Sequence, residues 1–94
     1  MTINDFENGK TRIMAEAREA LRRLGVEYHC VMFDVHTSQP HPRGATLTVT
    51  AEGNCVSGWF PADEIEDCRD HIARQDVREK IASLVGRVKE AVAG

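Results

Sequence analysis

The sequence has few aromatic residues: one tryptophan, one tyrosine and three phenylalanines among its 94 residues. Aliphatic side chains must therefore fill most of the core. No apolar run approaches the roughly 20 residues that a membrane-spanning helix needs, so we expect no membrane span. The start, MTINDFENGK, has no apolar stretch, which predicts that there is no signal peptide and that the protein is cytoplasmic.

An excess of basic residues is also missing. Lysine and arginine together number 12, against 15 for aspartate and glutamate, and the formal net charge is −3. Nucleic-acid-binding proteins usually carry a basic surface that neutralises phosphates, so this charge argues against a nucleic-acid partner. The three cysteines cannot all pair within one chain. Without an export signal, we expect them to be reduced thiols.

What is present fits one α+β domain over residues 1–94. Hydrophobic residues make up 41% and charged residues 29% of the chain, which is ordinary for a globular domain. Apolar residues recur at helical spacing from about Ile3 to Leu24 and predict a first helix. Gly9 costs about 1 kcal/mol relative to alanine inside a helix, so we expect a firm helix only from about Lys10. Gly25 predicts the left-handed stop.

The segment from Val26 to Val35 has the composition of a strand. Both of its faces are largely apolar, which indicates a strand that is covered on both sides, or one that is covered on one side and exposed and adhesive on the other. The next segment, His36 to Gly44, contains Pro40 and Pro42 and is predicted to be a loop.

Thr46 to Phe60 predicts a hairpin, with Gly53-Asn54 as its two-residue turn. That turn places apolar residues and a glycine opposite one another on one face, in the pairs Ala51–Val56, Val49–Gly58 and Leu47–Phe60. The other face receives threonine and serine side chains together with Trp59. A shift of the pairing by one residue would scramble this separation.

Pro61 and the acids after it are typical of a helix start. The apolar stripe then slips out of phase near Gln75, so we expect either two helices, at about 62–73 and 76–92, or one helix kinked near Gln75. The predicted order is α-β-β-β-α(α). Helices packed on one face of a three-stranded antiparallel sheet are the natural arrangement for this order.

No pattern in the sequence predicts catalysis or a cofactor. Cys68 and His71 are three residues apart on a predicted helix, but structural zinc usually needs two such close pairs, so we expect no metal site. His29 and Cys30 would point to opposite faces of a strand. With no nucleophile–base–orienter pattern, we expect a non-enzymatic protein.

The strongest functional hypothesis concerns the second face of the sheet. If Val31, Phe33 and Val35 face the helices, a contact surface would form on the other side, and the residues we predict for it are Tyr28, Met32, Thr48 and Trp59. The loop at its edge adds His36, His41 and Arg43, which could bind an anion or a partner. Such a surface suits a protein partner or a homodimer. The alternative is that one of the last two helices covers this face as a second small core.

Two resemblances bear on this reading. The helix-strand-strand-strand-helix order is similar to that of double-stranded-RNA-binding domains, whose helix after the third strand begins with basic residues that meet phosphates. Here that position reads PADEIEDC, which would repel phosphate. The whole chain, with its hairpin TLTVTAEGNCVSGWFP, also resembles small uncharacterised proteins of Burkholderia-type proteobacteria. That resemblance implies an α+β domain and supplies no functional residues.

Overall fold

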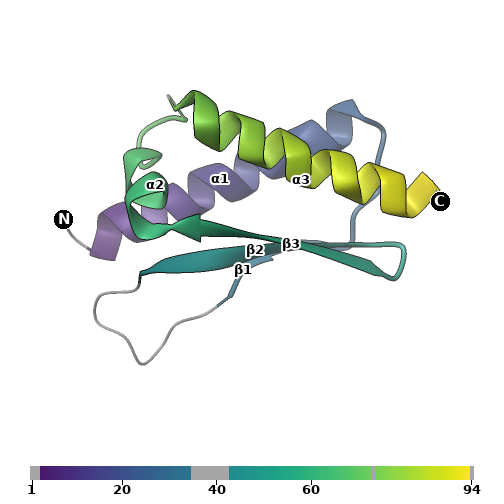
Figure 1. Cartoon of the computed structure of the whole chain (residues 1–94), viewed down its shortest axis with the longest axis horizontal. Coiled ribbons are helices and arrows are strands. Elements are labelled where there is room, and N and C mark those ends of the chain that lie inside the picture. The colour runs from purple at the N-terminus through teal and green to yellow at the C-terminus, as the bar shows by residue number, and fades with distance from the viewer. Residues whose placement is uncertain (1–2, 35–42, 73, 94) are drawn as a thin grey trace.

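A computed structural model of the chain describes residues 3–34, 43–72 and 74–93. The elements follow in the order α1 (Ile3–Arg23), β1 (Cys30–Phe33), β2 (Gly44–Ala51), β3 (Asn54–Pro61), α2 (Ala62–Asp67) and α3 (Gln75–Ala93). The strands form one antiparallel sheet in the order β1-β2-β3. The helices α1 and α3 lie over the same side of this sheet, and α2 sits at one end (Figure 1). The predicted α+β class and element order are confirmed.

Helix α1 begins at Ile3, so the expectation of a firm helix only from Lys10 is wrong. Gly9 lies within it and is buried. A Cβ at Gly9 would overlap the carbonyl oxygen of Ile65 and lie 2.6 Å from that residue's carbonyl carbon. The glycine therefore lets the backbone of α2 approach α1 closely. The low helix propensity of glycine gives no indication of this close approach.

The end of α1 follows the prediction. Gly25 has a positive φ of 72°. Its N–H donates to the carbonyl of Arg22 at 3.0 Å, and the N–H of Val26 donates to that of Leu21 at 3.0 Å. These two bonds define a Schellman motif, which closes the helix and satisfies its last carbonyl groups.

The hairpin forms, but its turn is Glu52-Gly53 and not Gly53-Asn54. Both central residues have positive φ, 49° and 80°, as a type I′ turn requires, and the glycine takes its second central position. The register pairs Ala51 with Asn54, Val49 with Val56 and Leu47 with Gly58. Each partner is thus two residues from its predicted place. Because side chains alternate with a period of two, the predicted separation of the faces survives.

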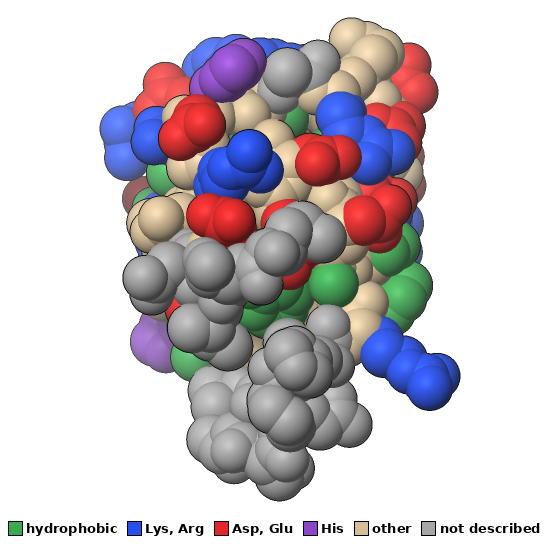
Figure 2. Space-filling view, turned by 90° about the vertical axis from the view of Figure 1, so that its left-hand side faces the viewer, with side chains coloured by type: hydrophobic (Ala, Val, Ile, Leu, Met, Phe, Trp, Pro, Cys, Tyr) green, Lys and Arg blue, Asp and Glu red, His purple; other side chains and the backbone are tan. Residues whose placement is uncertain are grey.

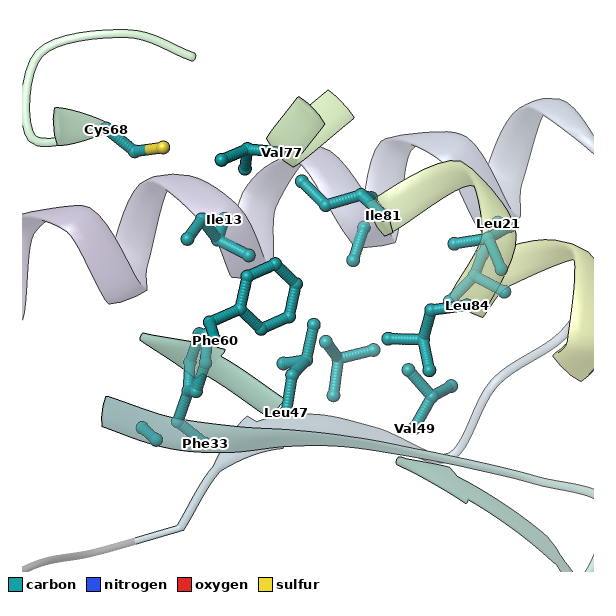
Figure 3. Packing of buried hydrophobic residues seen from close by; sticks show 14 of the residues in the cluster. Ile13, Leu21, Phe33, Leu47, Val49, Phe60, Cys68, Val77, Ile81 and Leu84 are labelled. Atoms are coloured by element: carbon teal, nitrogen blue, oxygen red, sulfur yellow. The ribbon is translucent and has the colours of Figure 1, made fainter. Parts of the chain in front are cut away.

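The core fills the space between the sheet and the two long helices (Figure 3). Phe60 is fully buried, and its ring meets that of Phe33 edge to face, with 5.8 Å between the centroids. The other labelled side chains come from α1, the sheet, the end of α2 and α3 and share complete or nearly complete burial: Ile13, Leu21, Leu47, Val49, Cys68, Val77, Ile81 and Leu84. Aliphatic residues thus supply most of the core, as the composition predicts.

Strand β1 is shorter than predicted and runs only from Cys30 to Phe33, with Val35 outside the described residues. Val26 is instead part of the hydrogen-bonded motif that closes α1. The last part contains two helices, so the alternative of one kinked helix is wrong. Helix α2 ends at Asp67 and not near residue 73, because backbone bonds from Cys68 to Ile65 and from Arg69 to Glu66 tighten its last turn.

Candidate functional site

One face of the sheet has no long helix over it, since α1 and α3 both lie on the other side (Figure 1). The alternative that a C-terminal helix covers it is therefore wrong. We call this surface the open face, and it is formed by Cys30, Met32, Thr46, Thr48, Thr50, Cys55, Ser57 and Trp59. Met32 is 51% exposed and Trp59 is 54% exposed. Two large apolar side chains therefore meet solvent on a surface that strand pairing holds in place.

Strand pairing arranges the open face in rows. Thr48 lies between Met32 and Ser57, and Thr50 lies between Cys30 and Cys55. The hydroxyl groups of Thr48 and Ser57 are 3.1 Å apart and share a hydrogen bond. Because one of the two O–H groups already donates to the other hydroxyl, burying the pair under a partner costs less than burying two unpaired hydroxyls.

One side of the Trp59 ring packs against the backbone of Gly44. A Cβ at Gly44 would lie 2.6 Å from Cζ2 of Trp59, so the indole ring lies over the bare backbone at the start of β2. A diagonal neighbour on one sheet face is within reach of an aromatic ring. Sequence reasoning missed this role of Gly44, which we had assigned to a loop. A tryptophan that already packs against the sheet loses less conformational entropy on binding than one without such a contact.

Charge is absent from the open face. None of its eight side chains is a lysine, arginine, aspartate, glutamate or histidine, although 29% of the chain is Asp, Glu, Lys or Arg. Asp34 follows β1 directly, and its Oδ1 accepts a hydrogen bond from the backbone N–H of Thr46 at 2.7 Å. A hollow of about 400 Å³ lies beside Met32, Thr48 and Asp34, so one carboxylate borders the open face.

The predicted site residues are only partly brought together. Met32, Thr48 and Trp59 share the open face. Tyr28 precedes β1 and is half-buried against the core, so it does not join them. Arg43 is exposed directly before β2, and its carbonyl accepts a hydrogen bond from the N–H of Ala62 at 2.8 Å. The other two predicted residues, His36 and His41, lie outside the described residues.

The charged side chains at the start of α3 are largely paired with one another. Arg74 binds Asp76 at 2.7 Å and Asp67 at 2.9 Å, and Lys80 binds Glu64 at 2.7 Å. Hydrogen bonds to these carboxylates raise the pKa of Arg74, and the guanidinium lowers the pKa of Asp76. Figure 2 views this end of the molecule and shows acidic and basic side chains interspersed.

Thiol and metal chemistry find little support in the described residues. Cys68 is fully buried, and desolvation raises the pKa of its thiol, with a further rise from the Asp67 carboxylate. Cys30 is half-buried and Cys55 is exposed. Across residues 3–34, 43–72 and 74–93, no three His, Cys, Asp or Glu side chains gather closely enough to hold a metal ion. None of the described helices is long and apolar enough to cross a membrane.

Comparison of the chain with protein families, with curated proteins and with solved structures finds no match. The resemblance to small proteins of Burkholderia-type proteobacteria therefore stays a prediction. The evidence on function comes from the geometry of this chain.

Proposed function

We propose that this chain is a non-enzymatic interaction domain that binds a second copy of itself through the open face. The observation that carries the proposal is the uncharged face on which Met32 and Trp59 are each more than half exposed. Exposed faces of antiparallel sheets are ordinarily polar. Burying these two side chains would remove apolar surface from water, at about 25 cal/mol per Å².

A second copy suits this surface because a two-fold interface brings the same patch of both subunits into contact, so the patch must be compatible with an identical patch. A patch that carries charges of one sign repels its copy. The eight side chains of the open face are uncharged and only the Asp34 carboxylate borders them, whereas the chain as a whole has a net charge of −3. Two copies can therefore approach through the open face with little repulsion.

The size of the face predicts a weak dimer. With strands about 4.8 Å apart and a rise of about 3.4 Å per residue, the three strands cover a flat area on the order of 300 Å². Standard stable interfaces bury about 800 Å² on each partner. We therefore expect dissociation constants in the micromolar range or weaker, and a monomer in dilute solution.

Sedimentation equilibrium of the full chain tests the proposal. We expect the wild type to associate as its concentration rises, and Thr48→Lys to stay monomeric because it places two like charges at the centre of the interface. The matched control is Ala15→Lys, which adds the same charge on the exposed side of α1 and should associate like the wild type. A wild type that is monomeric at millimolar concentration, or a Thr48→Lys variant that associates normally, would refute self-association through the open face.

The alternative predicted from the topology, a nucleic-acid-binding module, gains less support. The long helix after β3 begins at Gln75, so the acidic segment PADEIEDC belongs mainly to α2. However, Arg74 and Lys80 at the start of α3 are both held by carboxylates. Phosphate binding depends on cations that are free to replace condensed counterions, and we therefore favour the open face.

A further inference from the structure

The outer edge of β3 is a second surface, formed by backbone groups. Partners in an antiparallel pair alternate between residues that bond each other and residues whose N–H and C=O groups point away. The N–H of Ala62 bonds to the carbonyl of Arg43 across the β2–β3 pair at 2.8 Å, which fixes the even-numbered residues as those facing β2. The backbone groups of Cys55, Ser57 and Trp59 therefore point out of the sheet.

Two of these outward carbonyl groups are held by cations from α3. Arg87 donates from Nη2 to the carbonyl of Ser57 at 3.3 Å, and Lys80 donates from Nζ to that of Trp59 at 3.4 Å. No described residue accepts a hydrogen bond from the outward N–H groups at positions 55, 57 and 59. The edge thus combines open donors with acceptors that are only loosely occupied, since both bonds are at the long end of the hydrogen-bond range.

Of the two cations, Arg87 is the one placed to attract an acidic partner. Arg87 is exposed, and it forms no ion pair with any carboxylate in the described part of the chain. Lys80 is shared between Glu64 and the Trp59 carbonyl. Cationic side chains are a common way to discourage indiscriminate strand pairing at a sheet edge. Here they would repel a basic strand and attract one that carries carboxylates.

We propose that the outer edge of β3 accepts an extended acidic peptide as a fourth strand. The carbonyl groups of the peptide accept hydrogen bonds from the N–H groups of Cys55, Ser57 and Trp59. The peptide's carboxylates draw Arg87 away from the Ser57 carbonyl, which frees that carbonyl to accept a peptide N–H group, while Lys80 stays paired with Glu64. The opposite edge is a poorer acceptor, because β1 has four residues and Arg18 occupies the carbonyl of Val31 at 3.4 Å.

An NMR titration of the ¹⁵N-labelled chain tests this proposal with a short capped peptide in which glutamate alternates with valine. We expect the amide signals of Cys55, Ser57 and Trp59 to shift and their hydrogen exchange to slow. The same peptide with lysine in place of glutamate should bind at least tenfold more weakly. Arg87→Gln should weaken binding of the acidic peptide about fivefold. Lys89→Gln should leave it unchanged, because Lys89 is an exposed lysine on α3 whose side chain forms no hydrogen bond with the described residues of β3.

Three results would overturn the proposal. These are equal binding of the lysine peptide, shifts confined to Met32 and its neighbours on the open face, and no shift at millimolar peptide. The open-face proposal is tested separately, because the edge uses backbone groups that Thr48→Lys does not alter. Peptide binding by that monomeric variant would show that the edge acts independently of self-association.

Discussion

Replacing Gly9 by alanine should destabilise the protein, although alanine is the better helix former. Gly9 lies inside α1 and is buried against α2. An added Cβ would overlap the carbonyl oxygen of Ile65 and lie 2.9 Å from its Cγ2. The oxygen belongs to the backbone of α2, so a change of side-chain rotamer cannot relieve the overlap, and the two helices must move apart.

The magnitude follows from two opposing terms. Alanine in place of glycine in a helix contributes about 1 kcal/mol of stability. Overpacking a tight contact costs about 1–3 kcal/mol or more, and the upper end applies where backbone must move. The net loss for Gly9→Ala is therefore about 2 kcal/mol. Gly86→Ala is the matched control, because Gly86 also lies within a helix, α3, and a Cβ there would meet nothing within 4 Å.

Urea unfolding followed by circular dichroism measures both variants. We expect the midpoint of Gly86→Ala to lie above that of the wild type and the midpoint of Gly9→Ala to lie below it. The difference between the two variants should be about 3 kcal/mol, which corresponds to roughly 2 M or more in urea for a domain of this size. If Gly9→Ala proves as stable as the wild type, the close approach of α1 and α2 is not what this glycine provides.

Two further outcomes follow from the titratable groups. Because Arg74 lowers the pKa of Asp76 below its ordinary value of 3.8, this carboxylate adds stability above pH 3.8 and loses that contribution as the pH falls through the lowered pKa. The urea midpoint of the wild type should therefore drop more steeply in acid than that of Asp76→Asn, and parallel curves would contradict the pairing. Alkylation of the native protein should modify Cys55 first and leave Cys68 protected until unfolding, because burial both shields the Cys68 thiol and raises its pKa. Equal rates for the two cysteines would show that the α2 region opens readily.

The sequence predicted the two sides of the hairpin better than it predicted the turn. A Gly-Asn pair is a common turn signal, but the chain bends at Glu52-Gly53. Glu52 has to adopt a positive φ for this, and nothing in its residue type indicates it. The error moved each partner by two residues, and a displacement by an even number leaves every side chain on its predicted face. Met32, Thr48 and Trp59 could therefore be assigned to one surface although the register was wrong.

What the sequence could not predict depends on contacts between distant segments. The sequence predicts that Gly9 weakens the helix around it. It does not show that Gly9 packs against Ile65, because Ile65 is far away in the chain. The two faces of β1 are both apolar, so only its pairing with β2 decides that Val31 faces the core and Met32 does not. Tyr28 was predicted on the wrong surface because β1 begins two residues later, at Cys30. In each case local propensity was outweighed by packing.

The two proposed surfaces can be separated because they are made of different atoms. Self-association depends on the side chains of the open face, and a new charge there abolishes it without changing any backbone group. Strand addition depends on the backbone of β3 and on Arg87 and Lys80, which reach the edge from α3. A cation on an edge carbonyl opposes pairing with a second β3, because two copies would bring their arginines and lysines together. If both proposals hold, we expect this closing of the edge to direct identical chains toward the open face and to keep the edge for a partner that carries carboxylates.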